Sequence, residues 1–238
     1  MRSLLLVRPD REEDIAAALE SGADCLVLDL AQSIVADDRL LAREHTLAAL
    51  QQASQRVHRQ LLYVRVNSLR SDCIDADLDA VMPGRPDGII LPESQNGADV
   101  QHLSVKLAVR EAALGLDDGA TKIIAIAAAT PASIFEMGSY RGASRRLAGL
   151  LYGGADLGIA ACVLTDGALA PAFSLARSLT LFAAKAANIV AIDGGSPPGI
   201  GDACLKRDCE TAWHDGFSAK LAVEPDQVAI IGAVFAER

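Results

Sequence analysis

The sequence lacks the features of a membrane-spanning, secreted or disulfide-linked protein. No apolar stretch reaches the roughly 18 residues that a membrane-spanning helix needs. The apolar start at residues 4–7 is short, and the charged residues 8–11 follow it at once, so it does not fit a signal peptide. The five cysteines are odd in number and form no C-x-x-C pair, which argues against a disulfide framework. We therefore expect a cytoplasmic protein in a reducing compartment.

Positive charge is also scarce. The chain has 22 Lys and Arg against 31 Asp and Glu, which gives a net charge of −9. Nucleic-acid binding draws mainly on clustered Lys and Arg. The densest positive cluster here is Arg141, Arg145 and Arg146, for which a solvated loop is the simpler interpretation. We expect small molecules or other proteins as partners, and neither nucleic acid nor a membrane.

Phosphate-binding loops and well-placed histidines are missing as well. The turn after the first apolar run reads Arg8-Pro9-Asp10, where a Rossmann-type sheet has a glycine-rich turn. The glycine pair at residues 194–195 is followed by Ser-Pro-Pro, not by the Gly-Lys of a Walker loop. All four histidines fall in predicted helices or surface connections, so a Ser-His-Asp arrangement is not expected.

What the sequence does contain is a repeated pattern of short apolar runs and helical segments. Such runs, bounded by polar, Gly or Pro residues, are typical of parallel strands buried on both faces. The runs cover residues 4–7, 25–29, 61–65, 88–93, 123–126, 150–152, 189–193 and 220–224. Segments with helical period cover residues 11–21, 37–55, 97–116, 131–137, 170–187, 202–214 and 225–235. This alternation, repeated about eight times, fits a closed barrel of about 250 residues better than an open doubly wound sheet. We predict a single-domain (β/α)8 TIM barrel over residues 1–238.

Several of these runs end on a charged residue, which a barrel would aim at one mouth. Arg65 lies among apolar neighbours, so its guanidinium must be paired or must face a ligand. One interpretation is an ion pair inside the barrel with Asp29 or Asp193. The other, which we favour at a strand end, is a bidentate clamp on a substrate carboxylate.

A second candidate group follows the run at residues 150–152. Asp156 comes directly after Gly153, Gly154 and Ala155, small residues that let backbone N–H groups approach a ligand. Its carboxylate suits a hard cation such as Mg²⁺, although it also suits the N-cap of a following helix. Glu93, on the loop after Leu91-Pro92, is a further candidate ligand, a structural partner of Arg65 or simply a solvated acid.

These motifs resemble the HpcH/HpaI aldolase and citrate lyase β-subunit family. The matching segments are RSLLLV at 2–7, GADCLVLDL at 22–30, VRVN at 64–67, PDGIILP at 86–92, TPASIF at 130–135, GSY at 138–140, YGGADL at 152–157, AIDG at 191–194 and GFSAKLAV at 216–223. The resemblance implies a (β/α)8 barrel that assembles as a trimer or hexamer. It also implies Mg²⁺-assisted making or breaking of a C–C bond beside an acyl-CoA thioester or in a 2-keto acid. Within it, Arg65 matches the substrate-gripping arginine and Asp156 the metal-binding aspartate.

The sequence departs from the family pattern at several acids. Ala129 stands where the family has its second metal-binding glutamate. Ala155 replaces the glutamate that precedes the metal-binding aspartate in the family. The Leu-Glu-Asp-Ser motif reads Leu-Ala-Gln-Ser at residues 30–33, and the lysine of Leu-Pro-Lys is Glu93. Because the sequence ends at Arg238, we expect no counterpart of the C-terminal lid that the family usually carries. These changes imply a weakened Mg²⁺ site, unless Glu93 supplies the missing ligand.

Three functional hypotheses follow. The first is a divergent C–C lyase acting on a citramalyl-, malyl- or citryl-type 3-hydroxyacyl-CoA, with Arg65 holding the carboxylate and Asp156 the metal. Gly154, Ala155 and Asp29 would help to bind substrate. The second is a non-catalytic or reassigned member, a pseudoenzyme that binds acyl-CoA or a carboxylate or acts as a partner subunit. The third is a small 2-keto-acid aldolase that does not use CoA.

Overall fold

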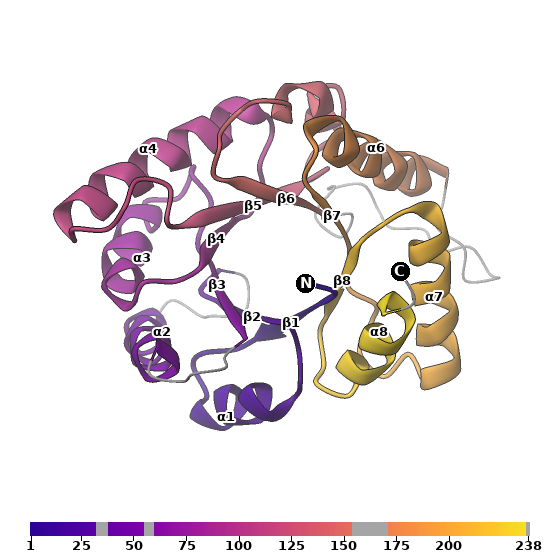
Figure 1. The fold of residues 1–238 in the computed structure, drawn as a ribbon, viewed down its shortest axis with the longest axis horizontal. Helices are drawn as coiled ribbons and strands as arrows, with labels where there is room; N and C mark the ends of the chain where they lie inside the picture. The colour runs from indigo at the N-terminus through magenta and orange to yellow at the C-terminus, as the bar shows by residue number, and fades with distance from the viewer. Residues whose placement is uncertain (32–37, 55–59, 154–170, 237–238) are drawn as a thin grey trace.

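The computed structural model describes residues 1–31, 38–54, 60–153 and 171–236 of the chain. Eight parallel strands form a closed barrel in which each strand pairs with the next along the chain and β8 pairs with β1. Eight α-helices surround this barrel, with the strands at the centre of the view in Figure 1. The predicted (β/α)8 TIM-barrel fold is therefore confirmed.

The strands follow the predicted apolar runs closely. They are β1 (Ser3–Val7), β2 (Cys25–Asp29), β3 (Leu61–Arg65), β4 (Gly88–Leu91), β5 (Lys122–Ala127), β6 (Leu147–Tyr152), β7 (Val190–Asp193) and β8 (Ala219–Ala222). Nearly all of their residues are buried, because one face of each strand lines the barrel and the other packs under the helices.

The alternation of side chains along each strand divides the apolar core into an inner and an outer part. Inside the barrel, Leu4, Val27, Tyr63, Ile124 and Ile192 belong to one packed cluster. The neighbouring strand residues face outward and join the larger cluster beneath the helices. The position of a residue along its strand therefore decides whether its side chain faces the barrel interior or the helices.

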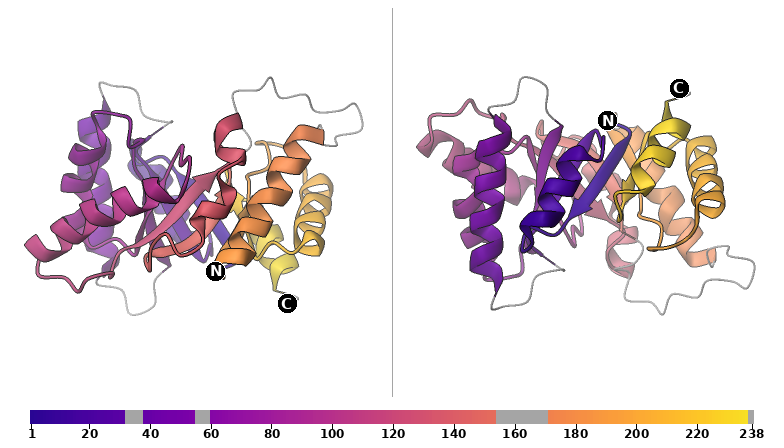
Figure 2. Two further views of the ribbon diagram at one scale, coloured as in Figure 1. Left: turned by 90° about the horizontal axis from the view of Figure 1, so that it is seen from above. Right: turned by 90° about the horizontal axis from the view of Figure 1, so that it is seen from below.

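The helices enclose the strands in both side views (Figure 2). They are α1 (Glu12–Glu20), α2 (Arg39–Ser54), α3 (Ile74–Val81), α4 (Gly97–Ala113), α5 (Pro131–Ile134), α6 (Pro171–Ala187), α7 (Asp202–Asp215) and α8 (Gln227–Phe235), with short 3₁₀ turns η2 (Met82–Gly84) and η3 (Met137–Tyr140). Among the described helices, none combines the length and the apolar composition needed to cross a bilayer.

One helix was not predicted from the sequence, and one is much shorter than its neighbours. Helix α3 has only eight residues, but Ile74, Leu78 and Val81 recur at helical spacing and are buried. Helix α5 is a single turn, which starts at a Thr130–Ser133 capping box with proline in its first turn. Because α5 and η3 replace a full helix after β5, this unit of the barrel has the shortest helical cover.

Candidate functional site

Two oppositely charged side chains end neighbouring strands at the carboxyl end of the barrel. Asp29, the last residue of β2, is paired in register with Arg65, the last residue of β3. Arg65 Nε donates to Asp29 Oδ1 at 2.7 Å and Arg65 Nη2 donates to Asp29 Oδ2 at 2.5 Å. This is a bidentate ion pair, the geometry in which an arginine fork fits a carboxylate best.

The pair lies in the mouth of the barrel and is largely shielded from water. Both side chains have the same strand parity as Val27 and Tyr63, which line the interior, so they also point inward. Asp29 is fully buried, and 8% of Arg65 is exposed. The structure therefore brings two predicted site residues, Arg65 and Asp29, into direct contact.

A buried carboxylate of α3 supports the end of β3. Asp77 Oδ2 accepts from the Asn67 backbone N–H at 2.8 Å and from Asn67 Nδ2 at 2.7 Å. Asp77 Oδ1 accepts from Arg43 of α2, from Nε at 2.9 Å and from Nη2 at 2.7 Å. Asn67 Nδ2 also donates to the Leu30 carbonyl, just after Asp29. Sequence reasoning missed Asp77, although an acid on the buried face of a short amphipathic segment is a usable signal.

Asp193, the other partner considered for Arg65, lies on the outer side of the barrel wall. It follows Ile192, which lines the interior, so its side chain points toward the helices. There it accepts from Arg177 Nε of α6 at 2.7 Å and from Lys220 Nζ of β8 at 2.8 Å. Burial acts to raise the pKa of Asp193, but the charges of Lys220 and Arg177 outweigh it and the pKa is lowered. Asp193 therefore belongs to the seam between β7 and β8, and not to the mouth.

The next two strand ends carry backbone geometry that is rare for residues other than glycine. Glu93 follows β4 with φ 51° and Ala128 follows β5 with φ 60°. The Glu93 side chain is exposed, and its carbonyl accepts from Arg70 Nη1 at 3.3 Å. Ala129 is buried. A left-handed conformation costs free energy in a residue other than glycine, so the turns after β4 and β5 are strained.

The described part of the mouth does not make up a magnesium site. No group of three His, Cys, Asp or Glu that could hold a metal occurs in the part of the chain that the structure describes. Asp29 is occupied by Arg65 and by the Ala31 backbone N–H, at 3.0 Å, and Ala129 has only a methyl group. Asp156, Gly154 and Ala155 lie outside the described residues. Within the described residues, Glu93 is the one predicted metal ligand.

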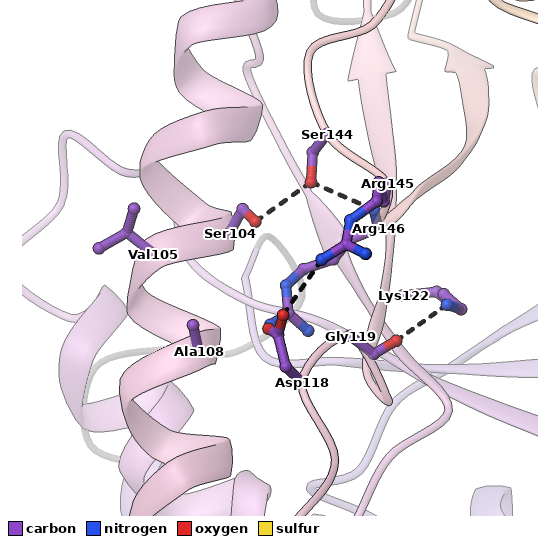
Figure 3. A pocket seen from close by; sticks show the side chains of 9 residues that line it. All are labelled: Ser104, Val105, Ala108, Asp118, Gly119, Lys122, Ser144, Arg145 and Arg146. Atoms are coloured by element: carbon purple, nitrogen blue, oxygen red, sulfur yellow. Dashed lines mark hydrogen bonds and ion pairs between the residues drawn. The ribbon is translucent and has the colours of Figure 1, made fainter.

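A hollow of about 240 Å³ lies beside α4 at the opposite end of the barrel, where β5 and β6 begin (Figure 3). Arg146, predicted to lie in a solvated loop, is instead buried there, and its Nη1 donates to Glu111 Oε1 at 2.7 Å. Its Nη2 donates to Asp118 Oδ1 at 2.5 Å, and Arg145 also pairs with Asp118. Lys122 Nζ donates to the Gly119 carbonyl at 2.8 Å. Since each cation of this hollow already has a partner, we interpret it as a structural cluster that joins α4 to β5 and β6.

Comparisons with known proteins agree over almost the whole chain. Residues 2–225 match the family model described as HpcH/HpaI aldolase/citrate lyase. The chain is 26% identical over 242 residues to a (3S)-malyl-CoA thioesterase of Cereibacter sphaeroides, with 98% of this chain and 76% of that protein covered. It is 27% identical over 235 residues to citrate lyase subunit beta of Escherichia coli, with 99% and 76% covered.

Solved structures show the same barrel. RipC from Yersinia pestis superposes with a TM-score of 0.77 at 25% identity, covering 99% of this chain and 94% of that chain. Protein CitE from Mycobacterium tuberculosis, in complex with magnesium and acetoacetate, superposes with a TM-score of 0.81 at 23% identity, covering 98% and 90%. The latter likeness shows the fold.

Proposed function

Because the chain belongs to the HpcH/HpaI aldolase/citrate lyase family, we propose that it is a divergent lyase that makes or breaks a C–C bond in a 3-hydroxyacyl-CoA thioester. The relatives named (3S)-malyl-CoA thioesterase and citrate lyase subunit beta support a malyl- or citryl-type substrate, and the citramalyl type is the third candidate of the same chemistry. The observation that carries the proposal is Arg65, a nearly buried guanidinium that ends β3 and points into the mouth of the barrel.

In this proposal Arg65 binds the carboxylate end of the substrate. A guanidinium forms strong charge-assisted hydrogen bonds to a carboxylate, and shielding from water strengthens them. The bound carboxylate would orient the rest of the substrate across the mouth, toward the end of β4 beside β3 and the end of β5 beyond it. Holding the reacting bond in one orientation is a large part of the rate enhancement that a binding residue can supply.

We further propose Mg²⁺ as the cofactor, with Asp156 and Glu93 as its ligands and Gly154 and Ala155 beside the substrate. The structure of citrate lyase beta subunit complexed with oxaloacetate and magnesium from Mycobacterium tuberculosis motivates this extension. When bound, such an ion polarises a carbonyl and stabilises an enolate. Mg²⁺ titration by calorimetry tests the ligands: Glu93→Gln and Asp156→Asn should each weaken binding, and unchanged affinity in both variants would contradict the assignment.

The alternative is a non-catalytic member that binds a carboxylate or an acyl-CoA without cleaving it. One observation favours it: the described mouth has only a methyl group at Ala129, where the family resemblance places a metal-binding glutamate. A steady-state assay against malyl-, citramalyl- and citryl-CoA, run beside calorimetry with oxaloacetate, separates the two. Turnover supports the lyase, whereas binding of oxaloacetate without any turnover supports the binder.

Arg65→Lys tests the residue that both proposals share. Lysine keeps the positive charge but loses the planar fork, so the KM for the thioester and the Kd for oxaloacetate should rise about tenfold or more. Arg146→Lys is a matched control, because Arg146 is also a buried, ion-paired arginine but lies at the opposite end of the barrel. Equal losses in the two variants would point to a general structural effect and would contradict a binding role for Arg65.

We also propose that the chain forms a homo-oligomer, a trimer or hexamer, as the family resemblance implies. Light scattering coupled to size-exclusion chromatography measures the mass in solution, and a monomer of 24.9 kDa would contradict the proposal.

A further inference from the structure

The Asp29–Arg65 pair presents a problem for a site that binds a carboxylate. A carboxylate already in contact with the guanidinium competes with the substrate for the same hydrogen-bond donors. It also neutralises the charge that would attract an anion. Asp29 is nevertheless fully buried and bidentate on Arg65, so the contact is a fixed part of the mouth.

We propose that Asp29 is a positioning residue, which holds Arg65 by one edge so that the other edge is presented to the substrate. This inference rests on the proposed function, because it takes Arg65 as the group that binds the substrate carboxylate. It also gives Asp29 a role different from the substrate contact expected from the sequence. A fully buried side chain is not a surface that a ligand can reach.

The donors of Arg65 divide in a way that leaves a complete fork for the substrate. A guanidinium has five N–H donors: one on Nε and two on each terminal nitrogen. Asp29 uses the Nε donor and one donor of Nη2. The other Nη2 donor and both Nη1 donors remain, which together form the end-on fork that a second carboxylate can bind.

The remaining donors are also accessible. Within residues 1–31, 38–54, 60–153 and 171–236, no side chain or carbonyl accepts a hydrogen bond from Arg65 Nη1. Arg65 has no atom among the buried side-chain nitrogens and oxygens of those residues that lack a hydrogen-bond partner, such as Arg39 Nε and Thr46 Oγ1. Arg65 Nη1 is therefore open to the mouth, and Nε faces Asp29.

The surroundings of Asp29 fix its own orientation, as positioning requires. The Ala31 backbone N–H donates to Asp29 Oδ1 at 3.0 Å, and the Leu30 N–H donates to the Arg65 carbonyl at 2.8 Å. Both residues of the pair thus sit on strands that are hydrogen-bonded to each other at the level of the pair. A carboxylate held in this way restricts the side-chain dihedral angles of Arg65, a long side chain that would otherwise lose much rotamer entropy on binding.

The test compares Asp29→Asn with Asp193→Asn. The two aspartates are a matched pair: each ends a strand, is buried and is ion-paired, but Asp29 faces the mouth and Asp193 the helices. Calorimetry with oxaloacetate gives the Kd for each variant. NMR spectra give a second readout, the resonance of the Arg65 Nε–H, which is assigned by its loss in Arg65→Lys. Its position and width report whether residue 29 still holds the guanidinium.

In Asp29→Asn we expect the Kd for oxaloacetate to rise about tenfold or more, because a misplaced binding group loses much of its effect. We also expect a shifted or broadened Arg65 Nε–H signal. Asp193→Asn should change neither. An unchanged Kd and Nε–H signal in Asp29→Asn, with Arg65→Lys still impaired, would overturn the positioning role alone. Unchanged binding in Arg65→Lys would instead overturn the proposed function.

Asp29→Glu keeps the experiment decisive if Asp29→Asn does not fold. Glutamate retains the charge, so the buried guanidinium stays compensated, but the extra methylene moves the carboxylate along the strand end. We expect a folded protein with an intermediate Kd and a displaced Arg65 Nε–H signal. Wild-type binding together with a displaced signal would show that the orientation of Arg65 is unimportant, and would overturn the proposal.

Discussion

At the scale of single residues, the mouth is shaped by hydrogen bonds that sequence patterns do not reveal. Tyr140, at the end of η3, is buried and its hydroxyl donates to the Ser94 carbonyl at 3.0 Å, with Ser94 Oγ at the same distance. Ser94 follows Glu93, and its N–H donates to the Ile126 carbonyl of β5 at 3.2 Å. Tyr140 therefore secures the strained turn that carries Glu93.

Tyr140→Phe should lower the free energy of unfolding by about 1–3 kcal/mol, because it leaves buried acceptors of Ser94 without a donor. Burial raises the pKa of Tyr140 to about 12, so the hydroxyl stays protonated and the effect should not change between pH 6 and about 10. Tyr63→Phe is the control, since the Tyr63 hydroxyl makes no hydrogen bond within the described residues. Urea unfolding of both variants measures the difference, and equal losses would contradict the role of Ser94.

At the scale of elements, a buried ion pair joins α4 to the start of two strands. Glu111 of α4 accepts from Arg146 and from the backbone N–H groups of Gly119 and Thr121, at 3.0 and 2.8 Å. Burial acts to raise the pKa of Glu111, but these hydrogen bonds outweigh it and the pKa is lowered. The carboxylate is therefore ionised at neutral pH and holds the α4–β5 connection against the residue that precedes β6.

Arg146→Ala should cost about 3–5 kcal/mol of stability, because it leaves the Glu111 charge buried without its partner. Arg145→Ala, one residue earlier, removes only an exposed pair with Asp118 and should cost about 1 kcal/mol or less. Urea unfolding curves of the two variants give the comparison. Similar midpoints would mean that solvent compensates Glu111 and that the pair is not a structural link.

The elements also show where sequence reasoning succeeds and fails. The apolar runs gave the strands to within a few residues, because parallel strands buried on both faces have a distinctive composition. Helix α3 was missed because its eight residues carry only two turns of the apolar period and alternate with acids. Residue 65 was identified as a candidate, but its partner was left open between Asp29 and Asp193. Side chains alternate between the two faces of a strand, so the two aspartates can be told apart once it is known which residues of β2 and β7 face the interior. Only the structure shows which residues these are.

At the scale of the whole molecule, a seam of charges links the last two strands of the barrel to the helix between them. Lys220 of β8 pairs with Asp193 of β7 at 2.8 Å and with Asp208 of α7 at 3.0 Å. Burial acts to lower the pKa of Lys220, but Asp193 and Asp208 outweigh it and the pKa is raised. These contacts connect the last two strands and the helix between them, in the region where β8 returns to β1.

This seam should make the stability of the barrel depend on pH. A lowered pKa in the folded Asp193 means that its contribution is complete above the unfolded value of about 4 and is lost as the pH falls through the lower folded value. The raised pKa of Lys220 acts at the other end: its contribution is present below about 10.4 and is lost as the pH rises through the folded value. Asp193→Asn should therefore lower the urea midpoint most at neutral pH.

The difference between wild type and Asp193→Asn should then shrink in acid, below about pH 4. Urea midpoints of both proteins between pH 3 and pH 8 measure it. A difference that stays constant over this range would show that the loss comes from packing and not from the charge of Asp193. The global arrangement was thus predictable from composition and periodicity. The seam was not, because it joins residues from the four elements α6, β7, α7 and β8.

The neutral pairing of Asp29 with Arg65 has a kinetic consequence. An arginine without a counter-charge would draw anions toward the mouth over long distances, but a close pair of opposite charges has a field that falls off quickly. The proposed substrate, a polyanionic thioester, would therefore approach a molecule of net charge −9 without long-range attraction from Arg65. Added salt should screen that repulsion and speed association, which is the opposite of the behaviour of an electrostatically steered enzyme.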